Sequence, residues 1–187
     1  MKKLLLFFVA AATLASCNLS KKQDAVKYND AIVAQTDKIN MRFIEITDAI
    51  TVIDMTKAEE LRKTAVQDCE TATKTVTELG AFDGDETFQK AALVYISDLK
   101  SMAENEFKSM FENLGTIVKI AGENPEEAEK LQKELEATGT EVEKKDNASS
   151  EKFLGAQRDF AKKYDIKLLD NPNQQKIDDA KTELEAQ

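Results

Sequence analysis

One stripe of side chains constrains the fold of this chain more than any other feature of its sequence. Its positions recur in steps that alternate strictly between three and four residues: 29, 32, 36, 39, 43, 46, 50 and 53. This spacing is typical of a helix that packs lengthwise on another helix. We therefore predict a helix over residues 22–53, and the pair Ser20 and Gln23 resembles a capping box that would start it near Lys21.

Two further stripes of the same kind follow. The second runs from Ala58 to Leu79 after a capping box formed by Thr56 and Glu59, and Cys69 lies on it. The third begins after a cap at Asp83 or Asp85 and continues to Ala121, where Gly122 is expected to form a left-handed C-terminal cap. Each stripe predicts one long amphipathic helix.

The third stripe slips between Met102 and Met110. Glu106 then falls on the apolar seam, and Phe107 lies beside it. A slip of this kind changes the local winding of a helix, so we expect an irregularity here.

A fourth helix has the clearest start signal in the chain. Asn124 offers a cap, and Pro125 suits the first helical position. The stripe fades over residues 143–152, so a kink or short break is expected near Gly139 or residues 147–150. For the tail, 171–187, two possibilities remain: a short docking helix or a loose end.

Long helices with short connections predict an all-α fold. The expected architecture is an antiparallel up-down-up-down four-helix bundle that occupies residues 23–170. No alternation typical of β-strands is found in the sequence.

The amino terminus has the order of a secretory signal peptide. Two lysines precede the apolar run Leu4–Ala12, which is too short to span a membrane, and small residues follow. Leu14-Ala15-Ser16-Cys17 resembles the lipobox of bacterial lipoproteins. The resemblance implies cleavage of signal peptide 1–16 between Ser16 and Cys17, acylation of Cys17, and a tether, 17–22, that attaches the bundle to a membrane.

Composition limits the chemistry that the chain can perform. Histidine is absent, which removes the usual general base and the commonest transition-metal ligand. The formal net charge of −9 argues against binding of nucleic acid. Because no set of residues suggests a catalytic site, we expect a protein that is not an enzyme and holds no cofactor.

Candidate ligand groups have simpler explanations. We expect Cys69 to be a buried, inert thiol, since it lies on an apolar stripe. The acids Asp83, Asp85 and Glu86 suggest calcium, but no EF-hand spacing follows them and helix capping explains them better. Met102 and Met110 are expected in the core. We therefore predict no metal site.

Two stretches resemble a group of small helical surface lipoproteins without assigned activity, known from spirochaetes and related didermic bacteria. They are residues 28–33 near the anchor and residues 156–164 near the end. The resemblance implies a similar bundle and an envelope location, and it supplies no catalytic residue. Many lipoproteins are retained in the inner membrane by an aspartate, whereas this chain has Asn18 at that position. This favours the outer membrane. Whether the protein faces the periplasm or the cell surface is left open.

Two functions remain as hypotheses. The first is a non-enzymatic binding or structural role in which the bundle presents a helical face to an envelope protein. The alternative is a small apolar ligand or lipid held between the helices. Its cavity would be lined by Cys69, Met102, Glu106, Phe107 and Met110.

Overall fold

The computed structural model describes the backbone of residues 5–168 and the side chains of residues 20–168. This part of the chain forms five helices: α1 (Leu5–Thr51), α2 (Met55–Leu79), α3 (Thr87–Glu104), α4 (Glu106–Ile120) and α5 (Pro125–Lys163). The only β-pairing among these residues is one isolated bridge between Phe82 and Asp85. The prediction of an all-α fold is confirmed.

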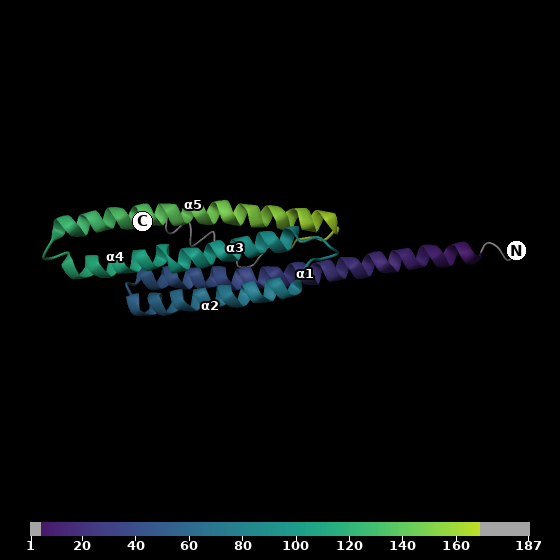
Figure 1. Ribbon diagram of the computed structural model, residues 1–187, viewed down its shortest axis with the longest axis horizontal. Coiled ribbons are helices and arrows are strands. Elements are labelled where there is room, and N and C mark those ends of the chain that lie inside the picture. The colour runs from purple at the N-terminus through teal and green to yellow at the C-terminus, as the bar shows by residue number, and fades with distance from the viewer. Residues whose placement is uncertain (1–4, 169–187) are drawn as a thin grey trace.

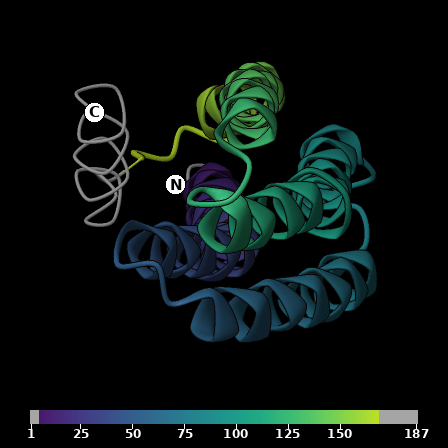
Figure 2. The same ribbon diagram turned by 90° about the vertical axis from the view of Figure 1, so that its left-hand side faces the viewer.

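The helices lie side by side along one axis. In Figure 1, α1 and α2 run in opposite directions, α3 and α4 follow one another in the direction of α1, and α5 returns. Figure 2 looks along this axis and shows α4 between α5 and the pair formed by α1 and α2. The finer arrangement, a four-helix up-down-up-down bundle, stays a prediction.

The stripe that predicted α1 forms its buried face. Ile32, Ile39 and Ile46 are completely buried, and Thr36 is almost so. Burial of each isoleucine contributes about 1.5–3 kcal/mol relative to an exposed position. The predicted start near Lys21 is wrong, because α1 is continuous from Leu5 and no glycine or proline separates the apolar leader from the stripe.

The cap of helix α2 lies two residues before the predicted cap, Thr56. The side chain of Asp54, not of Thr56, accepts a hydrogen bond from the backbone N–H of Lys57 at 3.0 Å. The threonines of α2 are poor helix formers in isolation. Here hydroxyls such as that of Thr71 donate to the carbonyl four residues earlier, which satisfies them within the helix.

The predicted slip in the third stripe coincides with a break. Asn105 divides the third predicted helix into α3 and α4. Gly122 is not a left-handed cap, since its φ is not positive, and α4 ends with Ala121 in right-handed conformation. The predicted left-handed cap at Gly122 is therefore wrong. Instead, the N–H groups of Glu123 and Asn124 both donate to the carbonyl of Ile120 and close the turn that leads to α5.

Helix α5 begins as predicted. The side chain of Asn124 accepts from the N–H of Glu127 at 3.2 Å, and Pro125 occupies the first turn. The expected kink or short break near Gly139 or residues 147–150 is not a break, because α5 is one continuous helix. Ser149 is buried and donates through Oγ to Asp98 of α3, which holds this weakly apolar turn in place. The predicted tail, 171–187, lies outside the described residues.

Candidate functional site: the anchor-proximal junction and the distal tip

Residues 21–29 of α1, the turn between α2 and α3, and the end of α5 meet at the end of the bundle nearest the amino terminus (Figure 1). We call the meeting point the junction. Its centre is aromatic: the ring of Tyr28 lies 5.1 Å from that of Phe82 and 5.5 Å from that of Phe160, centroid to centroid. The Tyr164 ring lies 4.9 Å from Phe82. Edge-to-face and tilted pairs at such distances stabilise a core beyond simple burial.

A tight turn brings Phe82 into this cluster. Asp83 and Gly84 both have positive φ, and Phe82 and Asp85 exchange two backbone hydrogen bonds of 2.9 and 3.1 Å. This is the pattern of a type I′ turn, for which Asp-Gly is a preferred sequence. The hydroxyl of Tyr28 donates to the carbonyl of Gly80 at 2.6 Å, so α1 holds the turn directly.

Three ion pairs surround the aromatic cluster. Lys21 lies 2.5 Å from Asp83, Lys22 lies 2.7 Å from Asp165, and Lys163 lies 2.5 Å from Asp85. The hydrogen bond from Lys163, together with those from Thr87, lowers the pKa of Asp85 below its usual range. Lys22 likewise lowers the pKa of Asp165. Lys21 and Lys22, which follow the anchor Cys17 closely in the sequence, therefore bind acids of the bundle.

The same contacts explain the acids that suggested calcium. Asp85 accepts from the N–H of Thr87, the first residue of α3, at 2.9 Å, but the N-cap position is Glu86, which makes no side-chain cap hydrogen bond, so the predicted cap at Asp83 or Asp85 is wrong. Asp83 pairs with Lys21, and Glu86 lies 2.6 Å from Lys90. No group of three or more histidine, cysteine, aspartate or glutamate side chains in the described part of the chain could hold a metal ion.

The junction also joins the two stretches that resemble spirochaetal lipoproteins. Gln157 of α5 donates through Nε2 to Oδ1 of Asn29 in α1 at 3.0 Å. Asn29 directly follows Tyr28, and Gln157 lies three residues before Phe160. Each of the two polar residues is therefore within one helical turn of one ring of the aromatic pair. Sequence analysis had no means to pair these stretches, which are more than 100 residues apart.

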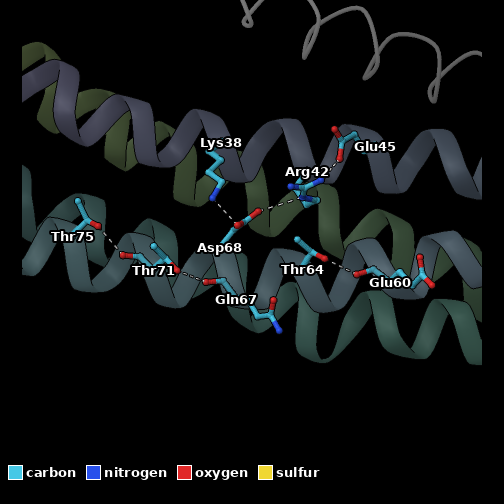
Figure 3. A network of polar contacts seen from close by, with 9 residues as sticks. All are labelled: Lys38, Arg42, Glu45, Glu60, Thr64, Gln67, Asp68, Thr71 and Thr75. Atoms are coloured by element: carbon cyan, nitrogen blue, oxygen red, sulfur yellow. Dashed lines mark hydrogen bonds and ion pairs between the residues drawn. The ribbon is translucent and has the colours of Figure 1, made fainter.

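A second polar contact fixes α1 against α2. Asp68 is 8 % exposed and lies 2.8 Å from Nζ of Lys38 and 3.3 Å from Nε of Arg42 (Figure 3). Two cations spaced four residues apart on α1 thus hold one buried carboxylate on α2. Sequence analysis missed this site; the available signal was an aspartate directly beside the apolar stripe of α2.

The residues proposed to line a ligand cavity divide into two groups. Cys69, Met102 and Phe107 are buried in the main apolar cluster, and Met110 packs against it half-buried. Burial raises the pKa of the Cys69 thiol to about 12. These side chains contribute to the packing of α2, α3 and α4.

Glu106 begins α4 immediately after the break at Asn105. Its Oε1 accepts from Lys145 of α5, whereas its buried Oε2 has no hydrogen-bond partner among the described residues. Two open surface furrows are found among the described residues, one on the charged face of α5 near Lys130 and one beside the α1–α2 loop near Asp48. Neither furrow is lined by any of the five residues that were expected to line a ligand cavity: Cys69, Met102, Glu106, Phe107 and Met110.

The opposite end of the molecule, which we call the distal tip, consists of the α1–α2 and α4–α5 loops and the helix turns next to them (Figure 1). Here Val52 is 73 % exposed, Ile53 59 % and Val118 58 %. The N–H of Ile53 donates to the carbonyl of Ile50, and the N–H of Asp54 donates to the carbonyl of Ala49. These two hydrogen bonds form a Schellman motif at the end of α1.

Ile53 occupies the left-handed position of this motif, with φ of 58°. Glycine is the usual residue there, because a β-branched side chain is strained at positive φ. The distal tip therefore combines exposed apolar side chains with local backbone strain.

Comparison with known proteins gives one match. Residues 1–18 match the prokaryotic membrane lipoprotein lipid attachment site. The chain is a bacterial lipoprotein. The lipoprotein is thus lipid-anchored in the cell envelope, as the sequence Leu14–Cys17 predicted. The backbone at Ser16 and Cys17 belongs to α1, and their side chains lie outside the described residues.

No curated protein and no solved structure matches the lipoprotein. The similarity to spirochaetal surface lipoproteins therefore stays a prediction. None of the helices, within the residues searched, is long and apolar enough to cross a membrane.

Proposed function

We propose that this lipoprotein acts without catalysis, as a lipid-anchored rod that presents its distal tip to a protein partner in the envelope. The observation that carries the proposal is the placement of exposed apolar residues: Val52, Ile53 and Val118 lie at the end opposite the anchor. Contiguous exposed apolar groups are typical of protein interaction surfaces, and we propose that these three residues contact one partner.

The distance between anchor and tip supports a role as a spacer. Cys17 and Thr51 belong to one uninterrupted helix. At about 1.5 Å per residue, the 34 residues between them span roughly 50 Å. A single helix that links anchor to tip would transmit the position of one end to the other.

The junction supports a fixed orientation of that rod. Among the side chains of α1 that the structure describes, from residue 20 onward, Ala25 is the first buried one, eight residues after Cys17. Eight residues span about 12 Å as a helix and at most about 28 Å when extended. The bundle would therefore stand close to the acyl chains, with its base held by the three ion pairs of the junction.

The backbone strain at Ile53 favours the distal tip over other exposed positions as the site that binds the partner. Strained backbone conformations persist where the surrounding structure enforces them, and they concentrate at functional sites. Val94 of α3 is exposed to a similar degree, at 55 %, but lies within a regular helix.

We further propose the outer membrane as the location of the lipoprotein. Many lipoproteins are retained in the inner membrane by an aspartate, whereas this chain has Asn18 at that position.

The proposal is tested by photo-crosslinking in intact cells. A photoreactive amino acid at position 53 or 118 should give one stoichiometric protein adduct, and the same amino acid at position 94 should not. Ile53→Lys should weaken the adduct formed from position 118, whereas Val94→Lys should leave it unchanged. Equal adducts from positions 53, 94 and 118, or none, would contradict a binding site at the tip.

A further inference from the structure

The furrow beside the α1–α2 loop belongs to the distal tip. Its apolar lining consists of Ala49 of α1, Val52 of the loop and Leu61 of α2. Ala49 and Leu61 are buried, whereas the side chain of Val52 is largely exposed. An open furrow with such a lining has room for an apolar side chain of another molecule. We call it the tip furrow.

One group of charged side chains at the tip furrow is balanced within the chain. Arg42 and Glu45, which both line the furrow, form an ion pair, and Arg42 also donates through Nε to the buried carboxylate of Asp68 at 3.3 Å (Figure 3). Lys38 completes the group at 2.8 Å from Asp68. Because the group contains two cations and two carboxylates, it offers no net charge to another molecule.

The other charged side chains that line the tip furrow are Asp48, Asp54 and Lys57, and all three are exposed. Within the described part of the chain, neither the carboxylate of Asp48 nor the ammonium group of Lys57 has a hydrogen bond or an ion pair. Asp54 accepts one hydrogen bond, from the backbone N–H of Lys57. The charge that the furrow offers to another molecule is therefore negative.

The end of α1 adds to this negative charge. The carbonyl end of a helix carries a partial negative charge, which basic side chains in the last turn offset. Helix α5 has Lys162 and Lys163 in its last turn, whereas α1 has no basic residue there and has Asp48 instead. The aspartate and the helix end therefore attract the same kind of ligand group, a cation supplied by another molecule.

The remainder of the distal tip has the same sign of charge. The α1–α2 and α4–α5 loops, each with one helical turn on either side, carry five acidic residues and two basic ones. They are Asp48, Asp54, Glu123, Glu126 and Glu127, with Lys57 and Lys119. Complementary charge on two surfaces speeds their encounter and selects between partners. A basic surface is therefore complementary to the tip.

We propose that the partner of the distal tip inserts a basic segment into the tip furrow, with one apolar side chain on the apolar lining and a lysine or arginine beside Asp48. This proposal rests on the proposed function, because it names the chemistry of the partner that binds the tip. The apolar contact contributes buried area, and the cation contributes specificity. An acidic or uncharged segment would leave Asp48 without a counter-charge.

Photo-crosslinking in isolated cell envelopes tests the placement in the furrow. A photoreactive amino acid in place of Val52, which lines the furrow, should give the same protein adduct as one in place of Val118. Mass spectrometry of the adduct from position 52 should locate the crosslink directly beside a lysine or arginine of the partner. An adduct from position 118 without one from position 52 would overturn the tip furrow as the binding site and leave the tip itself as one.

Charge variants test the sign of the partner, with the adduct from position 118 as the readout. Asp48→Lys should lower its yield roughly five-fold, and Asp48→Glu should preserve it. Lys57→Glu should raise the yield. Both Asp48→Lys and Lys57→Glu place at a helix end the charge that this end favours, so the tip should stay folded, and slow labelling of the buried Cys69 thiol verifies this.

Asp159→Lys is the matched control for Asp48→Lys. Asp159 is exposed, lies beside Phe160 at the opposite end of the bundle, and makes no hydrogen bond or ion pair among the described residues. The substitution changes the net charge by the same amount and should leave the yield unchanged. An equal loss of adduct for Asp48→Lys and Asp159→Lys would show that only the overall charge matters and would overturn the furrow contact.

Other partners give other patterns. A yield that rises with Asp48→Lys and falls with Lys57→Glu would indicate an acidic partner, and a yield that ignores both would indicate an uncharged one. Either pattern overturns the basic segment, while binding at the distal tip stands. The absence of any adduct from positions 52 and 118 in the natural background would overturn this proposal together with the proposed function.

Discussion

Gln157 of α5 donates a hydrogen bond to Asn29 of α1 at 3.0 Å, and so joins two helices that are the first and the last of the bundle. Asn29 is 8 % exposed, and its own amide donates to Asp30 at 3.1 Å. The pair closes the ring of helices at the junction, directly beside the aromatic contact of Tyr28 with Phe160.

Gln157→Ala should lower the free energy of unfolding by about 1–2 kcal/mol, because the buried Oδ1 of Asn29 loses its donor. Urea denaturation of the mature domain measures the effect. Gln132→Ala is the matched control: Gln132 is exposed on the same helix and makes only a long contact of 3.4 Å with Glu136. A change of more than about 0.5 kcal/mol for the control, or none for Gln157→Ala, would contradict the role of this contact.

Ile53→Gly should raise the free energy of unfolding by about 0.5–1 kcal/mol. Relief of the left-handed strain, about 1–2 kcal/mol, exceeds the entropic cost of a glycine, about 0.5–1 kcal/mol. Val52→Gly should instead destabilise by about 0.5–1 kcal/mol, since the φ of the neighbouring Val52 is not positive. Thermal melts of the two variants decide the matter, and destabilisation by both would refute the strain at Ile53.

The junction should weaken in acid. Because Lys163 lowers the pKa of Asp85 in the folded state, this pair stabilises the protein fully above the pKa of an unfolded aspartate, about 4. The contribution should disappear as the pH falls below that value through the lower folded-state pKa. Melting temperatures recorded from pH 6 to pH 2 should therefore fall less steeply below pH 4 in Lys163→Gln than in the natural protein, and parallel curves would contradict the coupling.

Cys69 should react slowly with thiol reagents at pH 8, where a free thiol with an ordinary pKa is partly ionised. Burial raises its pKa to about 12 and also blocks access, so labelling should become fast only after unfolding in urea. A native-state rate close to that of a small free thiol would show that the α2 stripe is exposed at this position.

Local patterns predicted those parts of the fold that local physics determines. The stripe through Ile32 and Ile39 predicted the buried face of α1, and Asn124-Pro125 predicted the start of α5. The slip near Glu106 predicted a local irregularity there, but the single continuous third helix that the stripe predicted is wrong, because the structure divides it into α3 and α4. In each case the deciding interactions lie within a few turns of one helix.

The errors arose where distant contacts outweigh local preference. A short break near residues 147–150 is absent, and Ser149 in this turn donates to Asp98 on another helix. The junction was equally inaccessible, since the pairing of Lys21 with Asp83 and of Lys22 with Asp165 requires the turn and the end of α5 to reach the base of α1.

The anchor at Cys17 is the premise of the account, and Cys17→Ala tests it most directly. Cells that express the natural or the substituted protein are separated into membrane and soluble fractions, and the protein is followed in both. We expect the natural protein in the membrane fraction and the Cys17→Ala protein released into the soluble fraction, still folded as judged by a slow Cys69 thiol. Continued membrane association of the folded Cys17→Ala protein would contradict a lipid anchor at this residue.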